Sequence, residues 1–230
     1  MSDSPSGESF AQPLDALRVQ VDRFDEQIVR LLNERARVVV QIGKIKQLSG
    51  SPIYAPDREK AVLERLHELN RGPLPDRALD AVYRELMSGS FALEKPLRIG
   101  YLGPEGSFSH AAAARQFGNS VDYVPLADIQ SVFAEVARSH IDYGLVPVEN
   151  SLQGGIMETL DAFLTSSSAR ICAEVLIAVH HNLLAKEPWD QIKQITSKPE
   201  VFAQCRNWLS STAKSMCSCE RRTRCSPQCR

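Results

Sequence analysis

The first part of the chain carries apolar residues at alternating spacings of three and four. The series begins at Leu14 and, after one interruption, continues to Ile45. These spacings place the apolar side chains on one face of an α-helix, as in the seam of a coiled coil. At 1.5 Å per residue, a helix over residues 13–48 would be roughly 50 Å long, which is more than a small monomeric domain can cover. The pattern therefore predicts that a partner helix packs against this seam.

Two shorter helices are expected next. Pro56 and Asp57 suit the first turn of a helix, because proline fits there and an acidic side chain favours the positive helix end. This helix is predicted to run to Asn70, and a third helix is predicted over residues 75–94. Since no strand pattern occurs in this stretch, residues 1–95 are expected to form an all-α domain.

The pattern changes after Pro96, where short apolar segments begin to alternate with helical ones. Such alternation is typical of βαβ units and a parallel sheet, so residues 96–209 are expected to form an α/β domain. Strands are predicted over residues 97–102, 121–124, 142–148 and 171–180, and helices over residues 107–117, 128–139 and 159–164.

Composition narrows the classes of partner. The chain has 27 basic and 28 acidic side chains and a net charge of -1, which gives no indication of binding to nucleic acid or to an anionic membrane. No stretch approaches the roughly 20 apolar residues that span a bilayer, and the polar N-terminus lacks the apolar core of a signal peptide. A cytoplasmic protein is therefore expected.

Residues 210–230 differ from the rest of the chain. They lack apolar periodicity, are rich in arginine and serine, and contain Cys217, Cys219, Cys225 and Cys229. A zinc site is conceivable, but two separated cysteine pairs are typical of such sites and are missing here, so no metal is expected. We expect this tail to be disordered, and we hypothesise that the reading frame is lost near Ser210.

Arg35 interrupts the apolar seam of the first helix. An arginine buried there would cost several kcal/mol unless it met an anion, either a nearby carboxylate such as Glu34 or Glu59 or a bound ligand. Arg18 and Lys46 flank the same seam but would be about 42 Å apart along a straight helix. One small ligand can therefore touch both only if Arg18 comes from a second chain, and the pattern predicts a cationic pocket for a small dianion.

Several short stretches resemble the all-helical chorismate mutases at the N-terminus of bifunctional chorismate mutase/prephenate dehydratases, the P-proteins. The resemblance implies a homodimer of interlocked three-helix subunits that converts chorismate to prephenate by a Claisen rearrangement, without a cofactor, in phenylalanine biosynthesis. The matching stretches are Ala16-Leu17-Arg18, Leu31-Leu32-Asn33-Glu34-Arg35, Gly43-Lys44-Ile45-Lys46, Asp57-Arg58-Glu59 and Tyr83-Arg84-Glu85-Leu86-Met87-Ser88, followed by Ser90 and Glu94.

The resemblance also implies which side chains hold the two carboxylates of chorismate. Arg18 of the partner subunit and Arg35 would bind one carboxylate each, and Arg58 would support the carboxylate end. Ser90 is expected among the substrate-binding residues. Where some relatives carry an acid three residues before the Arg58-Glu59 pair, this chain has Ala55, so that contact would be absent.

The remaining implied roles concern the breaking bond and the ring. Lys46 would sit at the ether oxygen, where negative charge develops, and Glu59 would bind the ring hydroxyl. Glu94 stands where some relatives carry glutamine. Because a carboxylate would repel the ether oxygen, Glu94 would have to be protonated to donate, and the mutase is expected to favour lower pH.

Two polar segments follow predicted strands in the α/β region. They are residues 103–109, with Ser107 as a candidate N-cap, and residues 146–161, at the edge where open α/β sheets bind ligands. Their order resembles the prephenate dehydratase family, whose catalytic part has two lobes similar to periplasmic binding proteins. The resemblance implies conversion of prephenate to phenylpyruvate in a cleft lined by Ser107, Glu149, Asn150, Ser151 and Thr159.

The family's Thr-Arg-Phe motif and its phenylalanine-sensing ACT domain are not found, and the resemblance is expected to end near Leu209. The expected fold is therefore an all-α three-helix mutase dimer joined to a partial dehydratase domain that resembles one periplasmic-binding-protein lobe. We expect an active mutase with a defective or absent dehydratase activity. The alternatives are a fully bifunctional enzyme and a non-catalytic dimeric module that senses an anionic metabolite.

Overall fold

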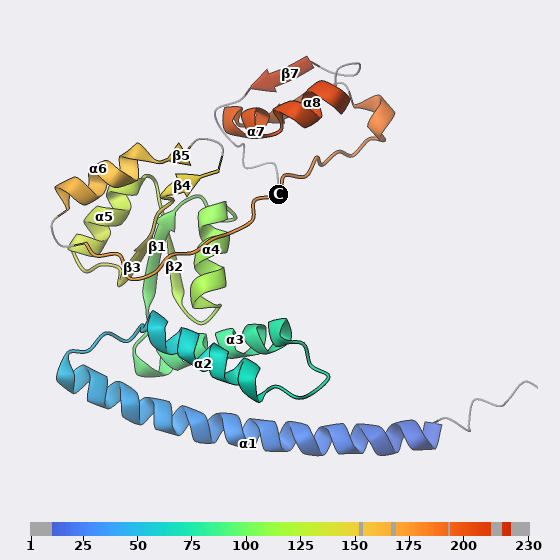
Figure 1. Ribbon diagram of the computed structural model, residues 1–230, viewed down its shortest axis with the longest axis vertical. Coiled ribbons are helices and arrows are strands. Elements are labelled where there is room, and N and C mark those ends of the chain that lie inside the picture. Colours follow the sequence, from blue (N-terminus) through green and yellow to red (C-terminus); the bar gives the residue numbers. More distant parts are fainter. Residues whose placement is uncertain (1–10, 152–153, 167–168, 193, 213–217, 222–230) are drawn as a thin grey trace, which may run out of the picture. The chain divides into compact units, whose positions relative to one another are not determined.

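The computed structural model describes residues 11–151, 154–166, 169–192, 194–212 and 218–221 (Figure 1). The chain divides into two compact units. The first comprises Met1–Pro147 and Met157–Val175, and the second comprises Val148–Ile156 and Leu176–Arg230.

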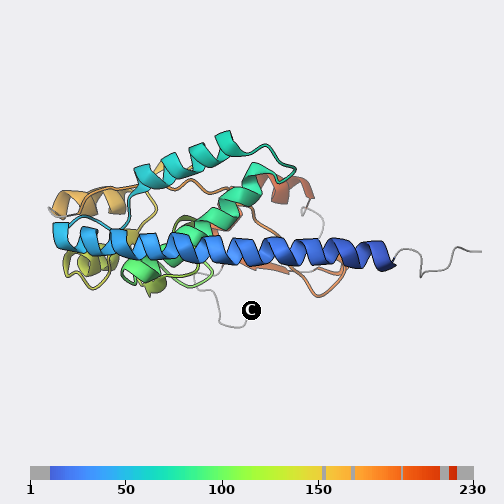
Figure 2. The same cartoon turned by 90° about the horizontal axis from the view of Figure 1, so that it is seen from below.

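Three helices open the first unit, as the apolar pattern predicted. They are α1 (Ala11–Ser49), α2 (Pro56–Leu69) and α3 (Asp76–Glu94). Pro56 occupies the first turn of α2 together with Asp57 and Glu59, which confirms the predicted start of that helix. Figure 2 shows α1 as one long rod with α2 and α3 alongside it, and α3 contacts both of the other helices.

The apolar seam of α1 is largely exposed in the single chain. Phe24 at the middle of the helix is 59% exposed, and Leu17 and Leu31 are 57% and 56% exposed. Burying apolar surface stabilises a protein by about 25 cal/mol per Å², so a continuous exposed seam of this kind is unusual for a monomer. The part of α1 that the single chain does bury faces α3.

A three-stranded parallel sheet follows, with its strands in the order β2-β1-β3. The predicted βαβ alternation is confirmed, and Figure 1 shows α4 and α5 on opposite sides of the sheet. The elements are β1 (Arg98–Leu102), α4 (Phe108–Phe117), β2 (Asp122–Leu126), α5 (Ile129–Ala137), β3 (Tyr143–Leu145) and α6 (Met157–Thr165).

One apolar core joins α3 and the α1–α2 connection to the sheet. Ile99 and Tyr101 of β1, Phe117 of α4 and Phe91 of α3 are all buried in it, together with Tyr54 from the α1–α2 connection. The boundary between the helical part (α1–α3) and the α/β part (β1–β3 with α4–α6) is therefore packed, and is not an exposed linker.

The second unit contains two small sheets. In one, β4 (Glu149–Asn150) pairs antiparallel with β5 (Gly154–Gly155), and in the other β6 (Gln194–Ser197) pairs parallel with β7 (Ser218–Arg221). A 3-10 helix (Trp189–Gln191), α7 (Pro199–Gln204) and α8 (Arg206–Thr212) complete it. Ile195 and Phe202 form its core, with Leu209 packed against them.

The strand predicted over residues 171–180 is wrong. These residues form neither helix nor strand, and the side chains of Ile171 and Leu176 are 75% and 85% exposed. A strand requires a neighbouring strand for its backbone hydrogen bonds, and an apolar composition alone does not supply one.

The prediction of a disordered tail is wrong for two described segments. Helix α8 continues to Thr212, and β7 pairs with β6, whose free edge offers unpaired backbone groups to an added strand. Residues 213–217 and 222–230 lie outside the described residues, and with them Cys217, Cys225 and Cys229. No helix of the described chain is long and apolar enough to cross a membrane.

Candidate active site

A pocket of about 330 Å³ lies among α1, α2 and α3. It brings together six residues that the sequence had singled out from three separate stretches of the chain. These are Arg35, Lys46, Arg58, Glu59, Ser90 and Glu94. The other lining side chains are mainly apolar: Val38, Val39, Ile42, Ile53, Ala55, Val62, Met87 and Phe91. An apolar cavity with a few convergent charged groups is typical of a small-molecule site.

Lys46 and Glu94 form the inner end of this pocket. The Lys46 ammonium donates to Glu94 Oε2 at 3.1 Å and to the Ile53 carbonyl oxygen at 2.8 Å. The Glu94 side chain is only 7% exposed. The Lys46 side chain is 24% exposed, and its two acceptors hold the ammonium in a fixed direction.

Gly43 explains how α3 comes close enough to α1 for this contact. A Cβ atom at position 43 would lie 2.8 Å from Glu94 Cγ and 3.2 Å from Glu94 Cα. Because real Cβ atoms do not approach carbon atoms so closely, any larger residue would push the end of α3 away. The glycine three residues before Lys46 thus has a packing role at the site.

Arg35 meets a hydroxyl group, and no carboxylate of the described residues forms an ion pair with it. Its guanidinium donates to Ser90 Oγ at 3.0 Å, and that hydroxyl donates to the Leu86 carbonyl oxygen at 2.7 Å. Glu34 instead lies 3.8 Å from Arg30. The alternative of an internal ion pair with Glu34 or Glu59 is thus not what the structure contains, and the charge of Arg35 is available to an anion.

Glu59 is the carboxyl group in the pocket whose pKa is raised. Burial raises its pKa to about 7 from an ordinary value of 4.5, and the nearby positive charge of Arg84 opposes that rise. The sequence analysis had instead expected Glu94 to be the carboxyl group that needs a proton. The raised pKa of Glu59 was not predicted, because the depth of a side chain between two helices cannot be read from spacing alone.

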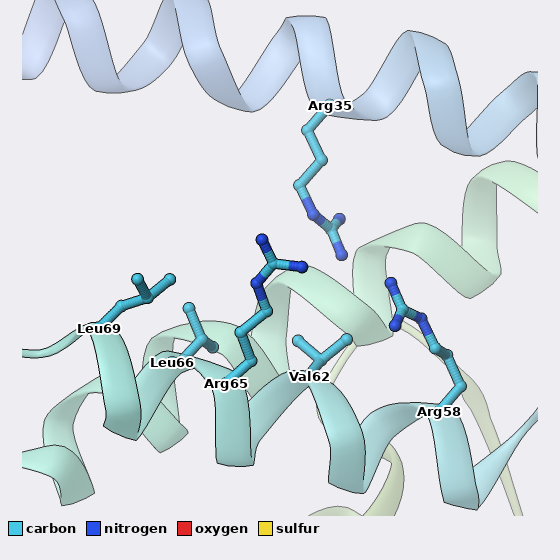
Figure 3. Close-up of a pocket in the computed structure, with 6 residues that line it drawn as sticks. All are labelled: Arg35, Arg58, Val62, Arg65, Leu66 and Leu69. Carbon is cyan, nitrogen blue, oxygen red and sulfur yellow. The ribbon is translucent and has the colours of Figure 1, made fainter.

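A second pocket of about 270 Å³ shares Arg35, Arg58 and Val62 with the first. Figure 3 shows the guanidinium of Arg35 reaching from α1 toward α2, while those of Arg58 and Arg65 reach from α2 into the same space. None of the described side chains lining this pocket is acidic. Three guanidinium groups facing one space favour an anion there, because they repel one another without it.

Arg65 was not among the predicted site residues. It follows Arg58 by seven residues, which is about two helical turns, so both side chains project from the same face of α2. This spacing is a signal that could have been found in the sequence.

Arg18 does not line either pocket. Its side chain is 67% exposed and pairs with Asp15 at 3.1 Å. Seventeen residues separate Arg18 from Arg35, a distance of about 26 Å along a helix. The Arg18 of the same chain therefore does not reach this pocket, and its predicted role in the site of a partner stays a prediction.

The residues predicted to line a dehydratase cleft lie in both units. Ser107 caps α4, as predicted: its hydroxyl accepts from the His110 backbone N–H at 3.2 Å and donates to the Leu102 carbonyl at 3.1 Å. Thr159 is fully buried and donates to the Pro147 carbonyl at 2.7 Å. Glu149, Asn150 and Ser151 belong to the second unit, so a common cleft stays a prediction. No group of three metal-ligating side chains occurs among the residues described here.

Two family models match the chain in succession. The model described as chorismate mutase type II matches residues 17–95, and the model described as prephenate dehydratase matches residues 99–222. The chain therefore belongs to the prephenate dehydratase family and carries a chorismate mutase type II region in front of it. The dehydratase match continues past Leu209, where the resemblance had been expected to end.

Curated relatives have the same two parts in their names. The bifunctional chorismate mutase/prephenate dehydratase of Stutzerimonas stutzeri is 45% identical over 210 residues, covering 88% of this chain and 57% of the relative. That of Pseudomonas aeruginosa is 44% identical over 205 residues, covering 86% and 56%. The chain thus spans little more than half the length of the curated relatives that it matches.

Among solved structures, a chorismate mutase (form II) from Thermus thermophilus shares 40% identity. The match covers 36% of this chain and 93% of that one, with a TM-score of 0.35.

Proposed function

We propose that the helical part of this protein is a chorismate mutase, which converts chorismate to prephenate within a pocket among α1, α2 and α3. The observation that carries the proposal is the convergence of Arg35, Lys46, Arg58 and Glu59 with Ser90 and Glu94 on that one pocket. The names of the relatives support the same reaction. Chorismate carries two carboxylates, which suits a pocket with two guanidinium groups and one ammonium group.

The rearrangement breaks a C–O bond and forms a C–C bond within one molecule, so it needs neither a nucleophile nor a cofactor. Arg35 and Arg58 bind the carboxylates and hold the substrate in the reactive chair. Lys46 donates to the ether oxygen as negative charge develops there. Fixed donors of this kind bind the transition state more tightly than the substrate and cost no reorganisation during the reaction.

Glu94 and Glu59 tune that field. In the pocket the Lys46 ammonium donates to both Glu94 and the Ile53 carbonyl. The ether oxygen therefore either replaces one of these acceptors or becomes an additional one. In its neutral form Glu94 would add a second donor to the oxygen, as the resemblance implies. Glu59 binds the ring hydroxyl, and near neutral pH it exists in both protonation states.

The mutase acts as a homodimer in this proposal. A second copy covers the exposed α1 seam, around Phe24 and Leu31, and brings Arg18 of the partner subunit to the carboxylate end of the pocket. Helix α1 has 39 residues, about 58 Å at the standard rise, and in the proposed dimer it would contribute to both sites.

The α/β part and the second unit are proposed to belong to a prephenate dehydratase. Prephenate would lose water and carbon dioxide to give phenylpyruvate, the reaction that the resemblance implies. The two activities together would place the protein in phenylalanine biosynthesis, as the family match supports.

The test is turnover of chorismate by the purified chain, followed by the loss of chorismate absorbance. Arg35→Ala should lower kcat/KM about 100- to 1000-fold, because it removes a half-buried, fixed donor, a loss of about 3 to 4 kcal/mol of transition-state stabilisation. Arg77→Ala, which removes an exposed charge on α3, is the matched control and should leave kcat/KM unchanged. Binding of chorismate without turnover would instead favour the non-catalytic sensing module.

A further inference from the structure

The connection between α1 and α2 contacts both the mutase pocket and the apolar core. Ile53 and Ala55 line the 330 Å³ pocket, whereas Tyr54 between them does not. Tyr54 is 2% exposed and lies in the core that the helices share with the sheet. Tyr54 therefore points into the core while the residues on either side of it line the pocket.

The α/β part surrounds the Tyr54 ring. Its centroid lies 4.9 Å from that of Phe117 on α4 and 5.3 Å from that of Tyr143 on β3. The Tyr54 hydroxyl accepts a hydrogen bond from the side-chain amide of Gln116 on α4. The ring is therefore fixed by packing and by a directed hydrogen bond from another part of the chain.

Helix α3 is fastened to the same region. Ser120 N–H donates to Ser88 Oγ at 2.9 Å, and Asn119 donates to Glu85 from its side chain at 2.8 Å and from its backbone at 3.2 Å. Gly118, with a φ of 71°, approaches so closely that an added Cβ would lie 2.5 Å from Ser88 Cβ. The contact is therefore a tight, hydrogen-bonded one.

The peptide bond between Ile53 and Tyr54 connects this contact to the pocket. Its carbonyl oxygen, on Ile53, accepts from the Lys46 ammonium at 2.8 Å, and its nitrogen belongs to Tyr54. Since the peptide unit is planar, the placement of Tyr54 restricts the direction of that carbonyl. Phe91 adds a second connection, because it lines the pocket and also packs against Tyr54 at 6.0 Å between ring centroids.

We propose that Tyr54 is a positioning residue of the mutase site: the α/β part holds Tyr54, and Tyr54 holds the Ile53 carbonyl that orients Lys46. This inference rests on the proposed mutase function. It makes the α/β part a support for mutase chemistry, in addition to its own dehydratase role. Tyr54 does not touch the substrate in this account.

The experiment measures kcat and KM for chorismate with the full chain. Tyr54→Ala should lower kcat about 10- to 100-fold while KM changes by less than about threefold, because Lys46 acts mainly on the transition state and a small displacement of such a group is costly. Gln116→Met, which lies outside the mutase pocket, should lower kcat in the same sense by about twofold to fivefold. Tyr54→Phe keeps the ring and loses only the hydroxyl, so it should match Gln116→Met.

Phe133→Leu is the matched control. Phe133 is buried on α5, where it packs against Phe163, so its change weakens the α/β part away from the Tyr54 contact. Its kcat should equal that of the parent chain. If Tyr54→Ala does not fold, Gln116→Met and Tyr54→Phe decide the question.

Unchanged kcat in Gln116→Met and Tyr54→Phe would overturn the proposal, as would an equal loss of kcat in Phe133→Leu. Failure of the parent chain to rearrange chorismate would contradict the proposed function itself. The two failures are therefore distinguishable.

Discussion

Arg35 stands in the α1 seam where an apolar side chain would otherwise be expected, and its guanidinium reaches into a groove shared with Arg58 and Arg65 (Figure 3). A buried or half-buried cation without a carboxylate is costly unless a ligand supplies the negative charge. At the scale of single residues, the arginine side chains of the site thus favour binding of an anion.

Arg65 lines the 270 Å³ pocket but not the 330 Å³ pocket, which contains the residues assigned to the reacting bonds. We expect Arg65→Gln to raise KM for chorismate about threefold to tenfold and to leave kcat nearly unchanged, because it removes attraction felt equally by substrate and transition state. Steady-state kinetics at low and high salt checks this, with Arg77→Gln as the control for net charge. A weaker dimer with unchanged KM would show that Arg65 pairs with an acid of the partner instead.

The raised pKa of Glu59 should make substrate binding depend on pH. Its pKa is about 7 in the free protein, and a dianion bound beside it favours the neutral carboxyl, so substrate binding is coupled to proton uptake. As pH rises through 7 the proton is lost and KM should increase. In Glu59→Gln, which is always neutral, KM should be flat between pH 6 and pH 8, about one unit either side of that pKa. A slope that persists in Glu59→Gln would assign the dependence to another group.

At the scale of elements, the close approach of α1 to α3 sets the distance between Lys46 and Glu94. Gly43→Ala should lower the free energy of unfolding by about 1 to 3 kcal/mol, because its Cβ would overlap the end of α3. It should also lower kcat, since the pair at the inner end of the pocket separates.

Gly89→Ala is the matched control for this glycine. A Cβ at position 89 of α3 meets nothing within 4 Å, so the substitution should stabilise the helix by about 0.5 to 1 kcal/mol. Thermal unfolding followed by circular dichroism compares the two. If both alanine variants were equally stable, the steric argument at Gly43 would fail.

The three helices and the first sheet could be predicted from the sequence because each has its own periodicity and its own terminal residues. Pro56 and Ser107 mark two helix starts that the structure confirms. The strand expected at residues 171–180 and the missed β7 depended on which segments find a partner, and the pattern of one segment does not contain that information.

The site residues, too, could be predicted from the sequence only in part. Spacing along α1 singled out Arg35, which interrupts the apolar seam, and Lys46, which flanks it, whereas Arg58 was expected from the family resemblance. Tyr54 was missed, since a tyrosine in a short connection has no periodicity to interrupt, and its importance lies in the core around it. The elevated pKa of Glu59 likewise depends on burial between helices.

At the scale of the whole molecule, the account requires two copies of the chain. In the proposed dimer, the exposed seam of α1 is covered by a second copy and each site takes Arg18 from the partner subunit, which would account for the exposure of both. Symmetric dimers use the same patch on both subunits, so two equivalent sites would result.

Co-expression of two inactive variants tests this claim most directly. Arg18→Ala and Arg35→Ala should each have little activity alone, but a mixed dimer would contain one site with both arginines intact. Random pairing makes half of the dimers mixed with one good site each, so the mixture should recover about a quarter of the parent turnover of chorismate. Activity no higher than the average of the two variants would contradict a site shared between subunits, and with it the central claim.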